Sequence, residues 1–433
     1  MRVAIGDGII ECVTSGTPPD VTDSTHAIGL PGMPNLHSHA FQRGMAGLAE
    51  VRGPQNDSFW SWREIMYRFV ERLEPASLQA IAALAYMEML ETGFTRVGEF
   101  HYLHHAPDGA PYDDPAELSQ AVFAAAEETG IGITHLPVFY AHSGFGGAQP
   151  NPSQWRFVTD LDRYASLFDA IRSASTGLPD AIVGIAPHSL RAVTEAELQT
   201  LDGLADGLPI HIHIAEQIQE VADSIAWSGQ RPVEWLLAHA QVDARWCLVH
   251  STHVTDVEAT AIARSQAVVG LCPVTEANLG DGIFPGAQFQ DQQGRFGIGS
   301  DSNVMIDMAE ELRWLEYGQR LALRARNVLA KTEGRSTGQT MFAAAMDGGG
   351  QALGYATGIA VGHAADMIAL DDRHASLTGR TAEAIMDAFV FAAGRQAIDT
   401  VWRRGAVVVR QGRHVARDAI VARYHRVLGT LLA

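Results

Sequence analysis

The strongest constraint on the fold is an alternation, between residues 28 and 303, of short apolar runs with longer segments of helical period. Runs of this kind are typical of parallel strands that are buried on both faces. We expect eight strands, over residues 28–37, 95–100, 132–140, 181–189, 209–216, 245–251, 267–273 and 295–301. Helices are expected between them, over residues 76–93, 115–130, 160–175, 194–205 and 254–265. Eight strand–helix units predict an α/β fold, a (β/α)8 TIM-type barrel, rather than a sandwich or a bundle.

Both ends of the chain differ from this central part. Residues 1–27 and 357–433 contain short alternating pieces separated by glycines and aspartates, followed by a last segment of helical character. Such pieces are typical of short strands. We therefore predict a small β-sandwich domain built from both termini, with a C-terminal helix, and a barrel domain over residues 28–356.

Composition narrows the possible partners. The 433 residues include 31 basic and 50 acidic side chains, which gives a formal net charge of −19. Nucleic-acid and anionic-membrane binders normally carry a basic surface, so neither partner is expected. No window reaches ~18 uninterrupted apolar residues, the N-terminus lacks an export pattern, and the three cysteines are far apart. These features predict a soluble, cytoplasmic protein that acts on small molecules.

Barrel enzymes place their catalytic groups at the C-terminal ends of the strands. In this sequence those ends carry many metal-binding residue types, namely His37, His39, His188, His211, His213, Glu216, His250 and Asp301. Two histidines at positions i and i+2 of a strand point to the same side, so His37 and His39 can face one ion. The cysteine spacing does not fit a thiolate zinc site of the cytidine-deaminase type, so histidines and carboxylates are expected to hold the ion.

Three imidazoles and one carboxylate suit Zn²⁺, Fe²⁺ or Mn²⁺. A bound Zn²⁺ can lower the pKa of a water molecule from about 15.7 to about 7, which provides a nucleophile at neutral pH. The ligand types therefore predict hydrolytic rather than redox chemistry.

The motifs also resemble those of the amidohydrolase superfamily in order and spacing. The matching segments are PNLHSHAFQRG, HIHIAEQ, LVHSTH, GIGSDSN and GHAADMIALD. The resemblance implies that the metal ligands are His37, His39, His213 and Asp301. It also implies that Glu216 is the proton shuttle and that His250 orients the nucleophile or substrate. Asp301 could also take a proton from the attacking water, while Glu216 could deliver one to a nitrogen leaving group.

The number of metal ions follows from a departure from the superfamily pattern. Many members bridge two metals with a lysine at the end of strand four, but the segment AIVGIAPHSL has none and Lys331 is the only lysine in the chain. We therefore expect one divalent ion per subunit, with Zn²⁺ as the first choice and Fe²⁺ or Mn²⁺ as alternatives.

Two of the residues at strand five have alternative interpretations. His213 is preferred over His211 as a ligand because His213 and Glu216 fit the H-x-x-E arrangement of the mononuclear deaminases. His211 is interpreted as a deeper, buried histidine bonded to the backbone. The plainer role for Glu216 is that of an acid at a helix N-terminus, where the helix dipole favours negative charge.

A closer similarity is to the formimidoylglutamate deiminases of histidine degradation, carried by the segments FQRGMAG, SFWSWREIMY, EFHYLHH, HSGFGGA, PHSLRAV and CPVTEANLGDGIF. It implies hydrolysis of N-formimidoyl-L-glutamate to N-formyl-L-glutamate and ammonia. It also places Arg191 on the α-carboxylate, with Gln42, Tyr102 and His188 on the rest of the glutamyl group. A dianion in a protein of charge −19 needs a local cation, and a guanidinium offers a bidentate fork. A homodimer is expected from the family alone.

These substrate assignments compete with structural alternatives. Arg191 could instead begin a helix and pair with Glu195 or Glu197, while Gln42 and Tyr102 could be ordinary loop residues.

The aromatic segment 58–69 and the reaction itself also have alternatives. The segment could be a substrate platform, or a helix that packs Trp60, Trp62 and Tyr67 over the barrel mouth. The nearest alternative function is deamination of a nucleobase or another heterocycle, which would not need Arg191. A non-enzymatic scaffold is disfavoured because every expected ligand is present.

Overall fold

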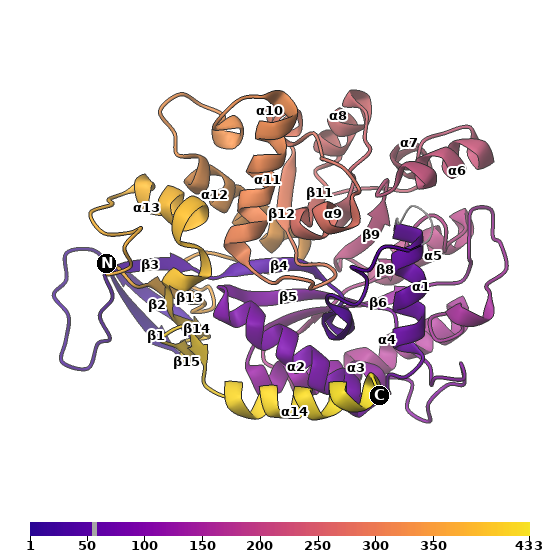
Figure 1. Cartoon of the computed structure of the whole chain (residues 1–433), viewed down its shortest axis with the longest axis horizontal. Coiled ribbons are helices and arrows are strands. Elements are labelled where there is room, and N and C mark those ends of the chain that lie inside the picture. Colours follow the sequence, from indigo (N-terminus) through magenta and orange to yellow (C-terminus); the bar gives the residue numbers. More distant parts are fainter. Residues whose placement is uncertain (54–58) are drawn as a thin grey trace.

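The computed structural model describes residues 1–53 and 59–433, and Figure 1 shows its elements in chain order. A closed ring of parallel strands occupies the centre: β4 (Met33–Ser38), β5 (Phe94–His101), β6 (Gly132–Phe139), β7 (Ile182–Val183), β8 (Ala186–Pro187), β9 (Ile210–Ile214), β10 (Trp246–His250), β11 (Val268–Leu271) and β12 (Arg295–Ile298). Single bridges from Ile185 to Ile210 and from Ser38 to Asp301 join its two sheets. This is the expected (β/α)8 architecture.

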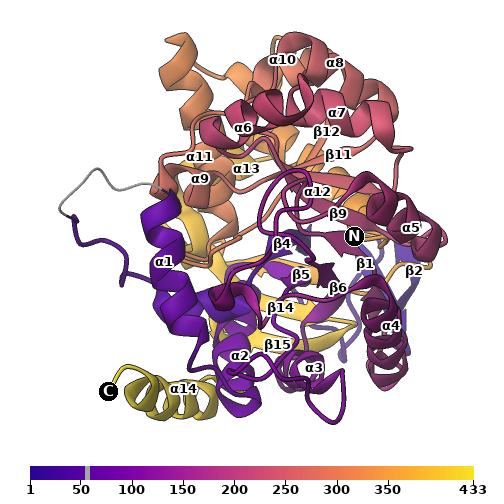
Figure 2. The same ribbon diagram turned by 90° about the vertical axis from the view of Figure 1, so that its right-hand side faces the viewer.

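Helices surround this ring (Figure 2). They are α1 (Phe59–Val70), α2 (Pro75–Glu91), α3 (Glu117–Thr129), α4 (Leu161–Ser175), α5 (Glu195–Ala205), α6 (Ile218–Ser228), α7 (Pro232–His239), α8 (Asp256–Ser265), α9 (Pro273–Leu279), α10 (Gly286–Asp291), α11 (Met308–Leu323) and α12 (Thr337–Ala352). Polar caps begin several of them. The Asp160 side chain accepts the N–H of Arg163 at 2.9 Å, and Thr255 accepts that of Glu258 at 3.2 Å.

The last turns of α12 close the N-terminal end of the barrel. A Cβ atom at Gly348 would lie 2.0 Å from the carbonyl oxygen of Phe296 in β12, so only glycine allows this approach. Just beyond, the carbonyl of Leu353 accepts a hydrogen bond from the Thr134 hydroxyl at 3.0 Å. The barrel is therefore sealed at this end, which leaves its C-terminal end as the open mouth.

Strands from both termini form separate antiparallel sheets beside the barrel, at the left of Figure 1. One sheet pairs β1 (Arg2–Gly6) with β2 (Ile9–Thr14), and the other has the order β16 (Arg413–His414), β15 (Ala406–Arg410), β14 (Ile398–Arg403), β13 (Met367–Leu370), β3 (Ile28–Pro31). The helical pieces near them are α13 (Glu383–Ala388) and α14 (Arg417–Leu431). The predicted division of the chain into two domains stays a prediction.

The single strand expected over residues 28–37 is wrong. Residues 28–31 form β3, which pairs with β13 of the terminal sheet, whereas residues 33–38 form β4 of the barrel. The chain changes sheet at Gly32, where a Cβ atom would lie 2.3 Å from the Thr95 side chain. Residues 28–38 form one largely apolar run, so hydropathy alone does not show that the chain passes from one sheet to the other.

Buried charges join the terminal sheet to the barrel. Arg403 of β14 pairs with Asp366 at 2.7 Å and with Asp180 at 2.6 Å, and Asp180 also pairs with Arg96 of β5 at 3.2 Å. On the outer surface, helix α14 runs along α2 and pairs Arg417 with Glu91 (Figure 1).

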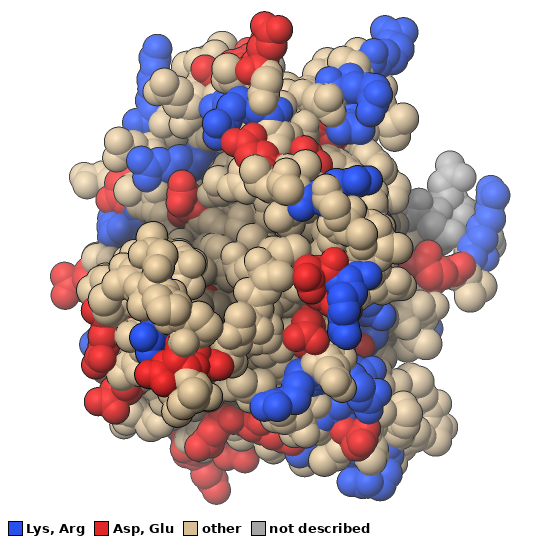
Figure 3. All heavy atoms as spheres, turned by 90° about the vertical axis from the view of Figure 1, so that its left-hand side faces the viewer, with Lys and Arg blue, Asp and Glu red and all other residues tan. Residues whose placement is uncertain are grey.

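Acidic and basic side chains are interspersed over the face formed by the terminal sheets (Figure 3). No helix of the described residues has the length and apolar character needed to cross a membrane.

Candidate metal centre and substrate pocket

Four of the predicted ligands converge at the barrel mouth. His37 lies near the end of β4 and His39 just follows it, His213 lies on β9, and Asp301 follows β12. The Nε2 atom of His37 is 3.2 Å from that of His39 and 3.0 Å from that of His213. Asp301 Oδ1 lies 3.4 Å and 3.3 Å from the Nε2 atoms of His37 and His39. All four residues are buried, so the structure brings the predicted set together as one cluster.

The hydrogen bonds of two imidazoles show which ring nitrogens are free for an ion. His39 Nδ1 lies 2.9 Å from the carbonyl oxygen of Phe100, and His213 Nδ1 lies 3.1 Å from that of His188. Because a carbonyl only accepts, each Nδ1 carries the hydrogen and each Nε2 presents a lone pair to the centre. Lone pairs of neutral rings at these distances repel one another unless a cation lies between them. The donor set therefore fits a divalent metal ion.

Electrostatics agree with this protonation. Burial lowers the pKa of His37 to about 3, which keeps the ring neutral at physiological pH. Burial alone would raise the pKa of Asp301, but its contacts with the surrounding histidines hold that pKa well below its usual range. Three neutral imidazoles and one carboxylate carry a net charge of −1, which attracts a dication.

The backbone around the centre is strained. Left-handed φ values occur at the ends of three barrel strands, at Ala215 (51°), His250 (67°), Ser251 (51°), Asp301 (43°) and Asn303 (55°). Non-glycine residues rarely adopt this conformation, and such outliers concentrate at functional sites. Here the turns direct the Asp301 and His250 side chains inward, because a strand continuing at ordinary φ would carry them past the mouth.

An amide network that sequence analysis missed holds two of these turns. The Asn303 side-chain amide donates to Ser38 Oγ at 3.1 Å and to the carbonyl oxygens of His39 at 3.0 Å and Asp301 at 3.1 Å. Asn35 donates to Ser300 Oγ at 2.7 Å and accepts the Ser300 N–H at 3.0 Å. The segment SDSN contained the signal, but only the closure of the barrel brings residues 35–39 against residues 300–303.

Glu99 supports the metal-binding loop from behind and was also missed. It lies in β5, is buried, and its Oε1 accepts the backbone N–H of Ala40 at 2.7 Å. Burial raises the pKa of Glu99 to about 8, against the opposing effect of the hydrogen bond from Ala40. This contact fixes the turn that follows His39, although Glu99 itself is not a ligand.

The predicted proton shuttle lies beside the metal cluster. Glu216 lines the pocket, and its Oε1 is 3.9 Å from His250 Nε2. The carboxylate of Glu220 accepts the backbone N–H groups of Ala215 and Glu216, both at 3.1 Å, and so fixes the loop that carries the shuttle. Burial raises the pKa of Glu216, which favours a protonated acid. Since α6 begins at Ile218 and Glu220 is its first-turn acid, Glu216 is not the helix-terminal acid of the alternative interpretation.

His250 ends β10 and bridges two acids. Its Nδ1 lies 3.3 Å from Glu276 Oε1, and its Nε2 lies 3.9 Å from Asp301 Oδ2. The Glu276 carboxylate therefore orients the ring, so that Nε2 points at the centre. Glu276 belongs to the segment CPVTEANL, and nothing in its sequence context indicated this contact.

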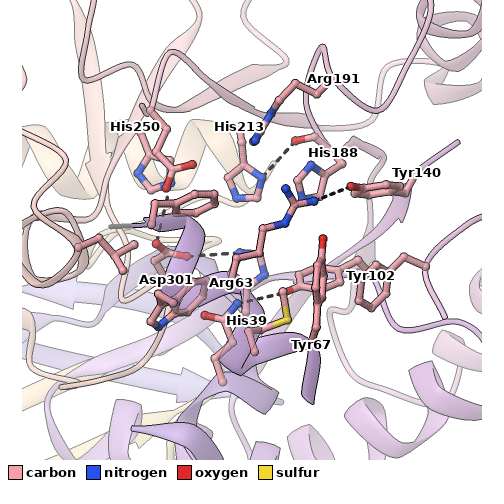
Figure 4. A pocket seen from close by; sticks show the side chains of 17 residues that line it. His39, Arg63, Tyr67, Tyr102, Tyr140, His188, Arg191, His213, His250 and Asp301 are labelled. Carbon is pink, nitrogen blue, oxygen red and sulfur yellow. Dashed lines mark hydrogen bonds and ion pairs between the residues drawn. The ribbon is translucent and has the colours of Figure 1, made fainter. Parts of the chain in front are cut away.

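A pocket opens above the cluster between the strand ends and helix α1 (Figure 4). Its walls include all four predicted substrate-binding residues, Gln42, Tyr102, His188 and Arg191. The Gln42 amide donates to the Tyr102 hydroxyl at 2.9 Å, and both residues are buried. These two residues are therefore part of the pocket wall rather than of exposed loops.

Arg191 is buried at the pocket and forms no ion pair with a described residue. Its Nε is buried without a hydrogen-bond partner, and its guanidinium lies 5.6 Å from the Trp60 ring. The acids of the alternative interpretation have other contacts, since Glu197 caps α5 and pairs with His142 at 3.0 Å, while Glu195 accepts from Gln199. A buried guanidinium without a carboxylate is costly, so the arrangement favours an anionic ligand.

A second arginine, Arg63, also faces the pocket and was not predicted. It lies on α1, donates to the Tyr140 hydroxyl at 3.0 Å, and stacks 5.1 Å from the Tyr67 ring. Figure 4 shows that Arg63 and Arg191 approach the region of His188 from different elements. The signal lay in the spacing of Phe59, Arg63 and Tyr67 along one helical face, which sequence analysis examined only for aromatic residues.

The aromatic segment expected over residues 58–69 is helix α1 from Phe59 onward, and Ser58 lies outside the described residues. Trp62 and Tyr67 line the pocket, so the helix covers the barrel mouth, and a contact of its aromatic side chains with substrate stays a prediction.

His211 lies one layer deeper in the barrel than His213. Its Nε2 donates to the carbonyl of Ala352 at 2.7 Å, and burial lowers its pKa to about 4. This is the geometry of the buried, backbone-bonded histidine of the preferred interpretation.

Comparisons with known proteins cover almost the whole chain. Residues 28–408 match the family model described as "Amidohydrolase family". A formimidoylglutamate deiminase from Pseudomonas aeruginosa is 49% identical over 428 residues, which cover 98% of this chain and 94% of that protein. The crystal structure of an amidohydrolase from Brucella melitensis is 51% identical, with a TM-score of 0.97, and the match covers 100% of this chain and 96% of that chain. A 5-methylthioadenosine/S-adenosylhomocysteine deaminase from Shouchella clausii is 26% identical, with 96% of this chain and 91% of that protein covered.

Proposed function

This chain belongs to the amidohydrolase family, and we propose that it hydrolyses N-formimidoyl-L-glutamate to N-formyl-L-glutamate and ammonia. The observation that carries this proposal is the 49% identity, over 98% of the chain, to a formimidoylglutamate deiminase. The chain is accordingly a hydrolase of C–N bonds in linear amidines. Deaminases of adenosine derivatives are much more distant, at 26% identity.

His37, His39, His213 and Asp301 would hold one divalent ion, with Zn²⁺ as the first choice and Fe²⁺ or Mn²⁺ as ions that the same ligands accept. When bound, such an ion acidifies water and polarises the carbon–nitrogen group of the substrate. The convergence of three Nε2 atoms and one carboxylate oxygen supports this assignment.

The surrounding residues would move the protons. Asp301 accepts a proton from the attacking water, whose oxygen forms the new bond to the formimino carbon. Glu216, whose pKa is raised by burial, donates a proton to the terminal nitrogen. His250 stabilises the charge of the tetrahedral intermediate through Nε2. The proton held by Asp301 then passes through Glu216 to the same nitrogen, and the carbon–nitrogen bond breaks so that ammonia leaves. The hydroxyl proton of the intermediate returns to Glu216, which restores the protonated acid.

The two arginines suit the two carboxylates of the substrate. Arg191 would bind the α-carboxylate, and Gln42, Tyr102 and His188 would contact the glutamyl chain. Arg63 would bind the second carboxylate from α1. This pairing is supported by the absence of an acidic partner for Arg191 among the described residues, in a protein of net charge −19.

An ammonia-release assay tests the proposal directly. The chain is expected to release ammonia from N-formimidoyl-L-glutamate far faster than from N-formimidoyl-L-aspartate or guanine. Release of ammonia from guanine alone would contradict the proposal and would indicate that the chain is a heterocycle deaminase. A homodimer and a cytoplasmic location stay predictions, and light scattering of the purified protein tests the first of them.

A further inference from the structure

A second set of metal-ligating atoms lies directly beside the first. His250, Cys272 and Asp301 each bring one ligand atom to within 4.8 Å of the others, and all three residues are buried. Cys272 follows β11, and its thiol has no part in the hydrolysis described above. We propose that these residues form a second, inhibitory binding site for a thiophilic divalent cation such as Zn²⁺ or Cd²⁺.

Glu276 contacts two of the three proposed ligands, His250 and Cys272. Its Oε1 faces His250 Nδ1 at 3.3 Å and accepts the backbone N–H of Cys272 at 2.9 Å. A carboxylate on one ring nitrogen is the usual companion of a metal-ligating histidine, because it fixes the ring and strengthens the other nitrogen as a donor. One acid thus orients His250 Nε2 and fixes the backbone from which the thiol extends.

The distances suit a small cation after a minor adjustment. A tetrahedral zinc ion has bonds of about 2.0 Å to nitrogen and oxygen and about 2.3 Å to sulfur, so its ligand atoms lie roughly 3.3–3.7 Å apart. His250 Nε2 is 3.9 Å from Asp301 Oδ2, so a shift of about half an ångström brings this pair to coordination distance, and the thiol, within 4.8 Å of both, must move toward them by up to about an ångström more. On binding, the Cys272 thiol becomes a thiolate and releases its proton to solvent.

The two sites share Asp301. Its Oδ1 faces His37 and His39 at 3.4 Å and 3.3 Å, whereas its Oδ2 faces His250. A carboxylate placed in this way can bridge two cations, as in two-metal sites. The negative charge of the nearby Glu276 carboxylate further favours a second dication there.

Occupancy of the second site is incompatible with proton transfer. The ion would take the lone pair of His250 Nε2 and an oxygen of Asp301, and it would lie beside Glu216, whose Oε1 is 3.9 Å from the same Nε2. The inhibition, unlike the binding, rests on the proposed function.

Metal stoichiometry tests the binding. In equilibrium dialysis against excess Zn²⁺, the wild-type chain is expected to hold two ions and Cys272→Ser one. Cys12→Ser is the matched control, because Cys12 is an exposed thiol on β2, far from the mouth, and should still hold two. Cd²⁺ should give a thiolate-to-cadmium absorption band in the wild type and in Cys12→Ser but not in Cys272→Ser. A wild type that stops at one ion, or a Cys272→Ser variant that keeps the band, would overturn the site.

Activity under excess zinc tests the inhibition separately. Zn²⁺ beyond one equivalent should lower ammonia release by the wild type roughly 10²-fold, the low end of what general acid–base groups contribute, and should leave Cys272→Ser nearly unaffected. Two bound ions without inhibition would refute the inhibitory role. Two bound ions in a chain that never releases ammonia would refute the proposed function alone. If Cys272→Ser does not fold, Cys272→Ala replaces it, and the wild-type stoichiometry still decides.

Discussion

The barrel interior contains two layers with opposite uses for the same residue type. His211 and His213 lie two residues apart on β9, point into the barrel and are both buried. In the lower layer, His211 donates to the carbonyl of Ala352. In the upper layer, His213 uses Nδ1 for a carbonyl and turns the lone pair of Nε2 toward His37 Nε2, 3.0 Å away. Burial is therefore common to both histidines, and the partner of Nε2 distinguishes the backbone-bonded one from the candidate ligand.

The backbone repeats this contrast. At the upper layer, Ala215, His250 and Asp301 have left-handed φ values without being glycines. At the lower end, the close approach of α12 to β12 is met by Gly348, which has no Cβ to clash. Backbone strain thus occurs at the barrel mouth, where side chains converge, whereas a glycine relieves the close contact at the closed end of the barrel.

The largest difference between the layers is expected from His213→Ala. Loss of one ligand should remove the metal and lower kcat/KM for ammonia release by roughly 10³-fold or more, since the metal supplies several kcal/mol of transition-state stabilisation. Metal content and ammonia release measure both effects. A variant that keeps its ion and its activity would show that His213 is not a ligand.

Arg191→Ala should have the next largest effect while leaving the metal in place. Removing a buried charged partner of a carboxylate costs about 2–5 kcal/mol, so kcat/KM for formimidoylglutamate should fall by roughly 10²–10³-fold. Arg172→Ala, an exposed arginine on α4, is the control and should change little. Full activity in Arg191→Ala would favour the heterocycle deaminase.

Glu99→Ala tests how far the upper layer depends on its support. Loss of the acceptor of the Ala40 N–H should weaken metal binding by about 10–100-fold, as for other groups that hold ligands in place. The measurement is the metal dissociation constant by competition with a chelator. Glu88→Ala removes an acid that pairs with Arg43 outside the pocket and should leave metal binding unchanged.

His211→Ala should reverse the pattern seen with His213→Ala. It leaves the buried carbonyl of Ala352 without its donor, so the free energy of unfolding should fall by about 1–3 kcal/mol. Metal content and kcat/KM per folded molecule should stay near the wild-type values. Denaturant titration with a parallel activity assay separates the two effects, and loss of metal from this variant would contradict the division into layers.

A last effect, on the pH dependence of stability alone, concerns two buried histidines that lie outside the candidate site. Burial lowers the pKa of His104 to about 4 and that of His135 to about 3, whereas both have a pKa of about 6.5 when unfolded. Below about pH 6.5 the unfolded chain binds more protons than the folded chain. The free energy of unfolding therefore decreases as the pH is lowered, by at most about 1.4 kcal/mol per pH unit for each histidine, and is constant above about pH 6.5. Urea titrations between about pH 7 and pH 4.5 measure this slope. It should flatten in His135→Gln but not in His425→Gln, which alters an exposed side chain.

Local patterns predicted the residues that act within one strand or loop. The H-x-H pair places two side chains on one side of a strand, and the acids of H-x-x-E and GSDSN lie just beyond strand ends. Glu99, Glu276 and Asn303 were missed because each is an ordinary acid or amide that supports a ligand through a contact made only when the barrel closes. Arg63 was missed because α1 lies outside the strand–helix repeat that directed the search.

Hydrophobic period and residue chemistry are local properties, and they predicted the barrel and the strand ends at which the candidate metal ligands lie. The change of sheet at Gly32 could not be predicted in this way. Nor could the hydrogen bond that occupies Nε2 of His211 but leaves Nε2 of His213 free, or the position of the Cys272 thiol beside Asp301. Those features depend on atoms brought together from distant parts of the chain, and ring closure of the barrel, a property of all eight units at once, is what brings them within hydrogen-bonding or coordination distance.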